Sequence, residues 1–154
     1  LKKNHNIIII RTFSKLYGLA GLRVGYGISN RKIIDYLNRV REPFNVNSAA
    51  QAAATAALSD KEHINKALKA VAEGKDFLYR QLLKMGLNFI RSATNFILID
   101  VGQDAKSISD KLLKRGIIIR DMNAWGLSNF IRVTVGRKAE NTAFIKALRE
   151  VIAK

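Results

Sequence analysis

The apolar residues of the chain begin as an unbroken run and then recur at helical spacing. Residues 7–10 are all isoleucine. A β-branched run without polar alternation is typical of a strand covered on both faces, so residues 7–10 predict an inner strand of a parallel sheet. Residues 24–28 predict a second strand soon after it. An inner strand needs a neighbour on each side, and we therefore expect this sequence to be a piece of a longer chain.

Three helices are predicted in the stretch that follows. Asn30 is a good N-cap, and the apolar residues after it keep helical spacing until Pro43, which ends the pattern. Residues 48–58 are rich in alanine, a strong helix former. Asp60 is expected to cap a long amphipathic helix that ends before Gly86.

Strands and helices alternate in the last part of the chain. Strands are predicted at residues 88–90, 95–101, 117–120 and 130–135, with a loop at 123–129. One helix begins after Asp104, and the last helix carries Phe144 and Leu148 on its buried face. The order is therefore β-β-α-β-β-α, which indicates an α+β domain with its helices on one face of the sheet.

The charge balance of the chain is strongly basic. Lysine and arginine total 27 against 12 aspartate and glutamate, a formal net charge of +15. Such an excess can mark a nucleic-acid-binding protein. The basic residues are spread along the predicted helices, however, and the interleaved aromatics of RNA-binding sheets are missing. We therefore expect a solvated basic surface and no nucleic-acid partner.

Composition also narrows the kinds of site and location. The chain has no cysteine, which rules out disulfides and thiolate metal sites and fits a cytoplasmic protein. No apolar run approaches the length of a membrane span, so no membrane partner is expected. His63 stands alone in the first turn of a predicted helix and is expected to be a surface residue. We therefore predict no metal site.

The residues after the first strand carry the candidate chemistry. In open α/β sheets, active sites gather beyond the carboxyl ends of strands, which is where Lys15 stands. A lysine that bonds a carbonyl compound must lose its proton, which desolvation or a nearby positive charge favours. Thr12 and Ser14 can donate hydroxyl hydrogen bonds to a phosphate, and Arg23 can pair with it through two N–H groups. The alternative is a strand and a glycine-rich turn with an incidental lysine.

The segment around Lys15 resembles a known cofactor-attachment sequence. Residues 12–26, Thr-Phe-Ser-Lys-Leu-Tyr-Gly-Leu-Ala-Gly-Leu-Arg-Val-Gly-Tyr, are similar to the pyridoxal-phosphate segment of fold-type I aminotransferases, above all of the histidinol-phosphate aminotransferases. The resemblance implies pyridoxal 5′-phosphate as the cofactor, bound by Thr12, Ser14, Lys15 and Arg23. It also implies that Lys15 is the catalytic residue and removes the Cα proton of an amino acid as a general base.

Two arginines near the end of the chain form a second candidate site. Residues 131–136 resemble the carboxylate-binding strand of the same family, which implies that Arg132 binds a substrate carboxylate. Residues 116–122 resemble the preceding strand of the family, which implies that Arg120 holds a substrate phosphate or the glutamate side chain. The alternative is a structural arginine paired with a protein carboxylate such as Asp121.

The resemblance covers almost the whole chain and implies its organisation. It implies an α/β fold in which residues 1–46 are the C-terminal remnant of the large pyridoxal-phosphate-binding domain. Residues 47–154 are then an interdomain helix and a small α+β domain. Family members take further cofactor contacts from a preceding segment and complete their sites across a dimer. We therefore expect a fragment that is inactive alone, from a parent that forms a homodimer. The pair Asn95-Phe96 also has a counterpart in the family, and its role is left open.

The function implied is the transamination of histidinol phosphate and imidazole acetol phosphate with glutamate and 2-oxoglutarate, in histidine biosynthesis. One alternative is another enzyme on the same scaffold, a threonine-phosphate decarboxylase or an aromatic aminotransferase. A second is a basic nucleic-acid-binding module, and a third is a non-catalytic dimerisation piece.

Overall fold

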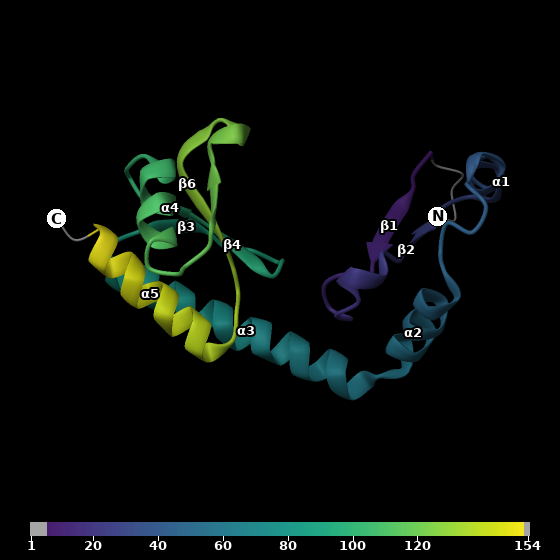
Figure 1. Ribbon diagram of the computed structural model, residues 1–154, viewed down its shortest axis with the longest axis horizontal. Coiled ribbons are helices and arrows are strands. Elements are labelled where there is room, and N and C mark those ends of the chain that lie inside the picture. The colour runs from purple at the N-terminus through teal and green to yellow at the C-terminus, as the bar shows by residue number, and fades with distance from the viewer. Residues whose placement is uncertain (1–5, 153–154) are drawn as a thin grey trace. The chain divides into compact units, whose positions relative to one another are not determined.

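The computed structural model describes residues 6–152, which form two compact units. The first unit extends to Leu68 and the second begins at Lys69, so the division falls within one long helix, α3 (Lys61–Lys84; Figure 1). The domain boundary between residues 46 and 47, implied by the resemblance, lies earlier in the chain and stays a prediction. Among the described residues, no helix has both the length and the apolar character that a bilayer span requires.

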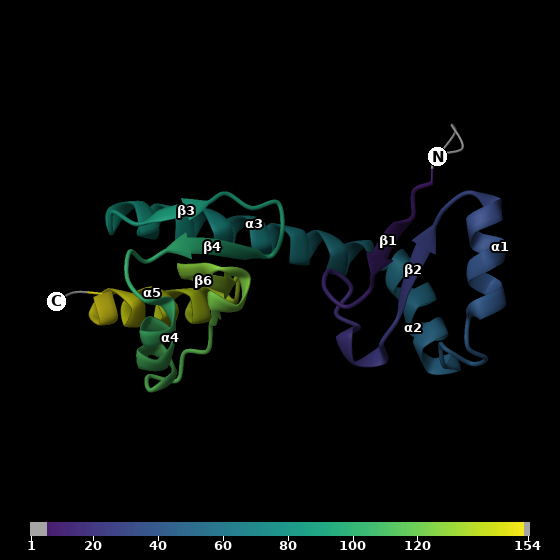
Figure 2. The same ribbon diagram turned by 90° about the horizontal axis from the view of Figure 1, so that it is seen from above.

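The first unit is built on a pair of strands. β1 (Ile9–Thr12) pairs antiparallel with β2 (Gly25–Ile28), as Figure 2 shows. Within the described residues, the predicted inner strand of a parallel sheet at residues 7–10 is not met. The pairing is antiparallel and the side chains are exposed, Ile10 to 78%. The reason is that strand side chains point to the two faces of a sheet, and neither Ile9 nor Ile10 joins a core formed by the described residues.

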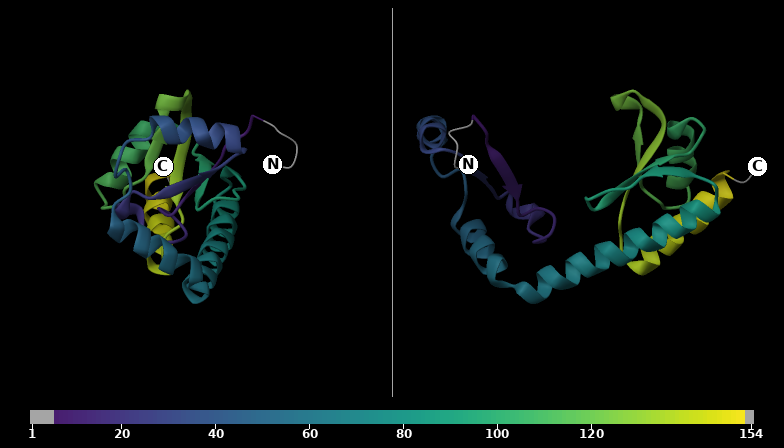
Figure 3. Two further views of the ribbon diagram at one scale, coloured as in Figure 1. Left: turned by 90° about the vertical axis from the view of Figure 1, so that its right-hand side faces the viewer. Right: turned by 180° about the vertical axis from the view of Figure 1, so that it is seen from behind.

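Helices α1 (Arg31–Val40), α2 (Ser48–Ser59) and α3 follow the strands (Figure 3). Each begins at a polar side chain whose oxygen accepts a backbone N–H of the first turn, at 3.0 Å for Asn30, 2.8 Å for Asn47 and 2.9 Å for Asp60. These bonds satisfy donors that the helix itself leaves without a partner. The predicted caps Asn30 and Asp60 are thus confirmed.

The second unit contains a four-stranded antiparallel sheet in the order β3-β4-β6-β5. After α3 come β3 (Asn88–Ile90), β4 (Phe96–Asp100), α4 (Ala105–Leu113), β5 (Arg120–Met122), the helical turn η2 (Asn123–Trp125), β6 (Leu127–Thr134) and α5 (Lys138–Ile152). The predicted order β-β-α-β-β-α is confirmed. Two boundaries were predicted wrongly, since β5 begins later than residue 117 and β6 begins within the predicted loop. Gly126, with φ of +74°, closes η2 and returns the chain directly into β6.

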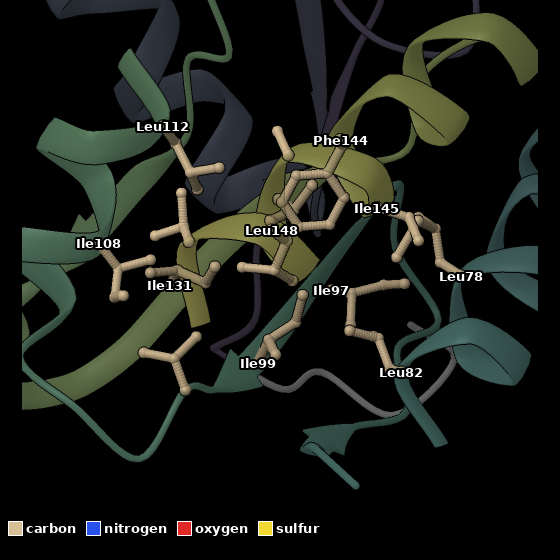
Figure 4. Close-up of a cluster of buried hydrophobic side chains, with 14 of the residues drawn as sticks. Leu78, Leu82, Ile97, Ile99, Ile108, Leu112, Ile131, Phe144, Ile145 and Leu148 are labelled. Atoms are coloured by element: carbon tan, nitrogen blue, oxygen red, sulfur yellow. The ribbon is translucent and has the colours of Figure 1, made fainter. Parts of the chain in front are cut away.

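The helices of the second unit cover one face of this sheet (Figure 4). Successive strand residues point to opposite faces, and Ile97, Ile99 and Ile131 all point to the covered one, where each is fully buried. The helices contribute Leu78, Leu82, Ile108, Leu112, Phe144, Ile145 and Leu148 to the same core. The alternate residues of β4 and β6, such as Phe96 and Arg132, lie on the other face of the sheet. The helices of this unit build their core on the first face, and the other face is called the open face below.

A buried asparagine joins the end of β6 to the helices. Asn141 of α5 is 3% exposed; its Oδ1 accepts the Gly136 N–H and its Nδ2 donates to the Gly136 carbonyl, each at 2.9 Å. Gly74 of α3 lies against Val135 and Asn141. A Cβ at Gly74 would stand 2.5 Å from Val135 Cγ1 and 3.0 Å from Asn141 Nδ2. The absence of a side chain at Gly74 therefore lets α3 pass close to the strand end.

Candidate active site

The connection between β1 and β2 holds Lys15 in a compact turn. Phe13 N–H donates to the Val24 carbonyl at 3.2 Å, which extends the pairing of the two strands. Leu19 N–H donates to the Phe13 carbonyl and Gly18 N–H to the Lys15 carbonyl, both at 3.0 Å. Gly18 has φ of +70°, a conformation that glycine adopts without strain. The backbone at Lys15 is therefore fixed by hydrogen bonds of the turn itself.

Phe13 anchors the turn in the small core of the first unit. Its side chain is 4% exposed and belongs to one cluster with Val24 of the same connection and with Ala50 and Ala54 of α2. The Tyr17 ring lies 4.8 Å from the Phe13 ring, centroid to centroid. The small alanine side chains leave room for these aromatic rings, so the alanine-rich α2 supports the turn that carries Lys15.

Three polar groups of this turn are free to meet a ligand. Lys15 is exposed, and its amine makes no hydrogen bond or ion pair with residues 6–152. Thr12 Oγ1 accepts the Ser14 N–H at 3.0 Å, which leaves the hydroxyl proton of Thr12 available. The Ser14 hydroxyl makes no hydrogen bond within the described part of the chain either. The structure therefore places one amine and two hydroxyls on a single turn.

Arg23 has an unusual backbone at the far end of the same connection. Its φ of 53° and ψ of 48° lie in the left-handed region, which non-glycine residues rarely adopt. Residues held there store about 1–3 kcal/mol of strain and cluster at functional sites. Its Nη1 donates to the Ala20 carbonyl at 2.8 Å, and the other N–H groups of the guanidinium remain for an anion.

His63 has a contact with this turn that the sequence did not reveal. The side chain is exposed, as expected, but its Nε2 lies 3.0 Å from the Leu16 carbonyl. Since a carbonyl can only accept, Nε2 donates and carries the proton. The two residues are 47 positions apart, so no local pattern could predict the contact. Among residues 6–152, no group of three or more histidine, aspartate or glutamate side chains is placed to bind an ion.

Arg120 and Arg132 lie directly opposite each other on β5 and β6. Opposite residues of antiparallel strands point to the same face, so both arginines stand on the open face. Neither guanidinium makes an ion pair or hydrogen bond with residues 6–152. Asp121, the alternative partner of Arg120, instead accepts the Asn123 N–H at 3.3 Å. Two like charges opposite each other are unfavourable by themselves and favour an anion that bridges them.

The structure thus gathers the predicted residues into two clusters. Thr12, Ser14, Lys15 and Arg23 share one connection in the first unit, and Arg120 and Arg132 share one sheet face in the second. Their assigned roles in binding a cofactor and a substrate remain predictions.

Comparison with known proteins gives one consistent family. The family model described as aminotransferase class I and II matches residues 1–148. The histidinol-phosphate aminotransferase of Moorella thermoacetica is 51% identical over 148 residues, which are 96% of this chain and 38% of that protein.

Two solved structures extend the comparison. The histidinol-phosphate aminotransferase from Sinorhizobium meliloti, in complex with pyridoxal-5′-phosphate, has a TM-score of 0.88 at 36% identity over 96% of this chain and 41% of its own. The L-threonine-O-3-phosphate decarboxylase from Porphyromonas gingivalis has a TM-score of 0.78 at 28% identity over 99% of this chain and 49% of its own.

The chain spans about two fifths of the length of the curated relatives it matches. Within that span the strands, helices and connections are those of aminotransferases, so the resemblance read from residues 12–26 and the fold-type I fold it implied are both confirmed. The chain belongs to the class I and II aminotransferase family.

Proposed function

We propose that the protein carrying this chain is a pyridoxal-phosphate-dependent aminotransferase of histidine biosynthesis. It transfers the amino group between histidinol phosphate and imidazole acetol phosphate on one side and glutamate and 2-oxoglutarate on the other. The names of the Moorella and Sinorhizobium relatives, and the cofactor named with the second, support this proposal. The observation that carries it is the segment around Lys15, where an unpaired amine, two available hydroxyl protons and the remaining N–H groups of Arg23 belong to one short stretch of chain.

The residues of the Lys15 turn fit the chemical groups of that cofactor. When bound, pyridoxal 5′-phosphate supplies an electron-accepting ring that stabilises negative charge at the substrate Cα. Thr12 and Ser14 would donate hydroxyl hydrogen bonds to phosphate oxygens, and the remaining N–H groups of Arg23 would balance the phosphate charge. Lys15 would hold the cofactor at rest; once released and neutral, its Nζ would take the proton from the substrate Cα and would deliver it to the cofactor carbon that receives the amino group, since a proton returned to Cα would give back the starting amino acid.

The arginine pair on the open face fits the anionic groups of both substrates. Histidinol phosphate carries a phosphate and glutamate carries two carboxylates, and all of these match the planar N–H fork of arginine. We assign a substrate carboxylate to Arg132 and the substrate phosphate or the glutamate side chain to Arg120. An anion held between the two also removes the repulsion of like charges across β5 and β6. One site can therefore accept both substrates in turn.

Assembly and location belong to the same proposal. The protein forms a homodimer, because the resemblance implies sites that are completed across subunits. Its place is the cytoplasm, where amino-acid biosynthesis runs. We expect the 154 residues alone to be inactive, because the contacts to the cofactor ring that the resemblance implies come from a segment outside them.

The natural full-length protein provides the test. It is loaded with pyridoxal 5′-phosphate and incubated with glutamate and imidazole acetol phosphate, and 2-oxoglutarate is measured beside a Lys15→Ala control. We expect 2-oxoglutarate from the wild type and a loss of at least about a thousandfold in the variant. Carbon dioxide from threonine phosphate without 2-oxoglutarate would favour the decarboxylase. Absence of both products would overturn the proposal.

A further inference from the structure

Phe96 is the residue of the open face whose role the sequence left unassigned. It begins β4, and the Asn95 carbonyl just before it accepts the Val135 N–H at 2.8 Å, which fixes the strand start against the end of β6. Phe96 lies opposite Thr134 in the pairing of β4 with β6. Arg132 is therefore its diagonal neighbour on the same face, within reach of an aromatic side chain.

The structure shows that this diagonal pair is in contact. The Arg132 Cζ stands over the Phe96 ring, 5.2 Å from its centroid. A guanidinium at that distance is attracted to the negative face of the ring. Arg132 has no acidic partner among residues 6–152, and Arg120 stands opposite it on the other side. Repulsion between like charges and attraction to the ring both favour a position of the Arg132 guanidinium over Phe96.

We propose that Phe96 is a positioning residue that holds the guanidinium of Arg132 for an anionic substrate. The inference rests on the proposed function, since it concerns the same substrate site. The ring attracts the positive charge centred on Cζ, while a carboxylate would bind at the edge of the guanidinium through two N–H groups. Ring and ligand thus do not compete. An arginine already held over the ring loses less conformational freedom when the anion arrives, which strengthens binding.

The contact also explains why an aromatic residue is needed at this place. A leucine would keep most of the apolar surface but would lack the ring quadrupole that attracts a cation. A tyrosine would keep the quadrupole and the planar shape. The contribution of Phe96 to substrate binding therefore follows the electronic character of its ring, whereas a purely structural role would follow only its size.

The experiment uses the natural full-length protein with Phe96→Leu, Phe96→Tyr and the control Ile90→Ala, which changes an exposed residue on β3. Glutarate, a dicarboxylate that cannot react, is titrated by calorimetry, and glutamate kinetics are measured in parallel. We expect Phe96→Leu to raise the Kd for glutarate and the KM for glutamate about tenfold, with kcat within about twofold. Phe96→Tyr and Ile90→Ala should stay within about twofold of wild type.

A shape-preserving variant covers the case in which Phe96→Leu fails to fold. Fluorination of the ring at Phe96 weakens its attraction for a cation with little change in shape, and we expect the Kd for glutarate to rise with each added fluorine. An unchanged Kd across the fluorinated series would overturn the inference. The calorimetry needs no turnover. A protein that binds glutarate in this ring-dependent way but makes no 2-oxoglutarate would therefore contradict the proposed function and leave the role of Phe96 standing.

Discussion

Replacing Asn141 by alanine should destabilise the second unit strongly. Asn141 is 3% exposed and makes two hydrogen bonds of 2.9 Å to the N–H and carbonyl of Gly136. Without the side chain, both backbone groups lose their partner, and each such loss costs about 1–3 kcal/mol when water cannot replace it. Gly136 is half-buried, so water reaches it in part. The expected loss in the free energy of unfolding is therefore about 2–4 kcal/mol.

Urea denaturation followed by circular dichroism measures this loss. A slope of about 2 kcal/mol per molar urea converts it into a shift of the midpoint by about 1–2 M. Thr142→Ala is the matched control, since Thr142 is the next residue of α5 but is exposed, and its change should stay within about 0.5 kcal/mol. A loss below about 1 kcal/mol for Asn141→Ala would refute the reasoning, because it would show that water satisfies Gly136 fully.

Two further substitutions test other contacts. Gly74→Ala places a Cβ 2.5 Å from Val135 Cγ1, and this overpacking should cost about 1–3 kcal/mol. The cost should exceed the gain of about 1 kcal/mol in helix propensity, so the urea midpoint should fall. A raised midpoint would show that the end of β6 shifts at little cost to make room for the added methyl group. His63→Ala removes the donor to the Leu16 carbonyl, so the amide of Gly18 should exchange its hydrogen faster, while His63→Gln should keep part of the protection. Equal exchange in wild type and His63→Ala would mean that the contact does not hold the turn.

The helices and their ends could be predicted because their signals are local. Asn30 and Asp60 accept N–H groups of the turn they begin, and the last six elements appear in the predicted order. The resemblance at residues 12–26 was equally local, since the motif is a continuous stretch. Within that stretch the structure also shows that the Lys15 amine has no partner among residues 6–152 and that Arg23 has a strained backbone. Neither property can be predicted from the sequence.

Features that depend on distant partners could not be predicted. The run at residues 7–10 has the composition of a covered strand, but burial depends on neighbours, and β1 has one strand beside it in the described chain. The contact of His63 with Leu16 and the stacking of Arg132 on Phe96 join separate elements. Both arginines of the open face were predicted as site residues from the sequence. Their placement directly opposite each other depends on the register of β5 on β6, which no local pattern indicates.

The covalent attachment of the cofactor at Lys15 is the most direct test of the central claim. The full-length protein is incubated with pyridoxal 5′-phosphate, reduced with borohydride and digested, and the modified peptide is located by mass spectrometry. Mapping is essential because the sequence has fourteen lysines besides Lys15. We predict one stoichiometric adduct on Lys15, absent in Lys15→Arg. Adducts scattered over other lysines, with Lys15 unmodified, would contradict the claim.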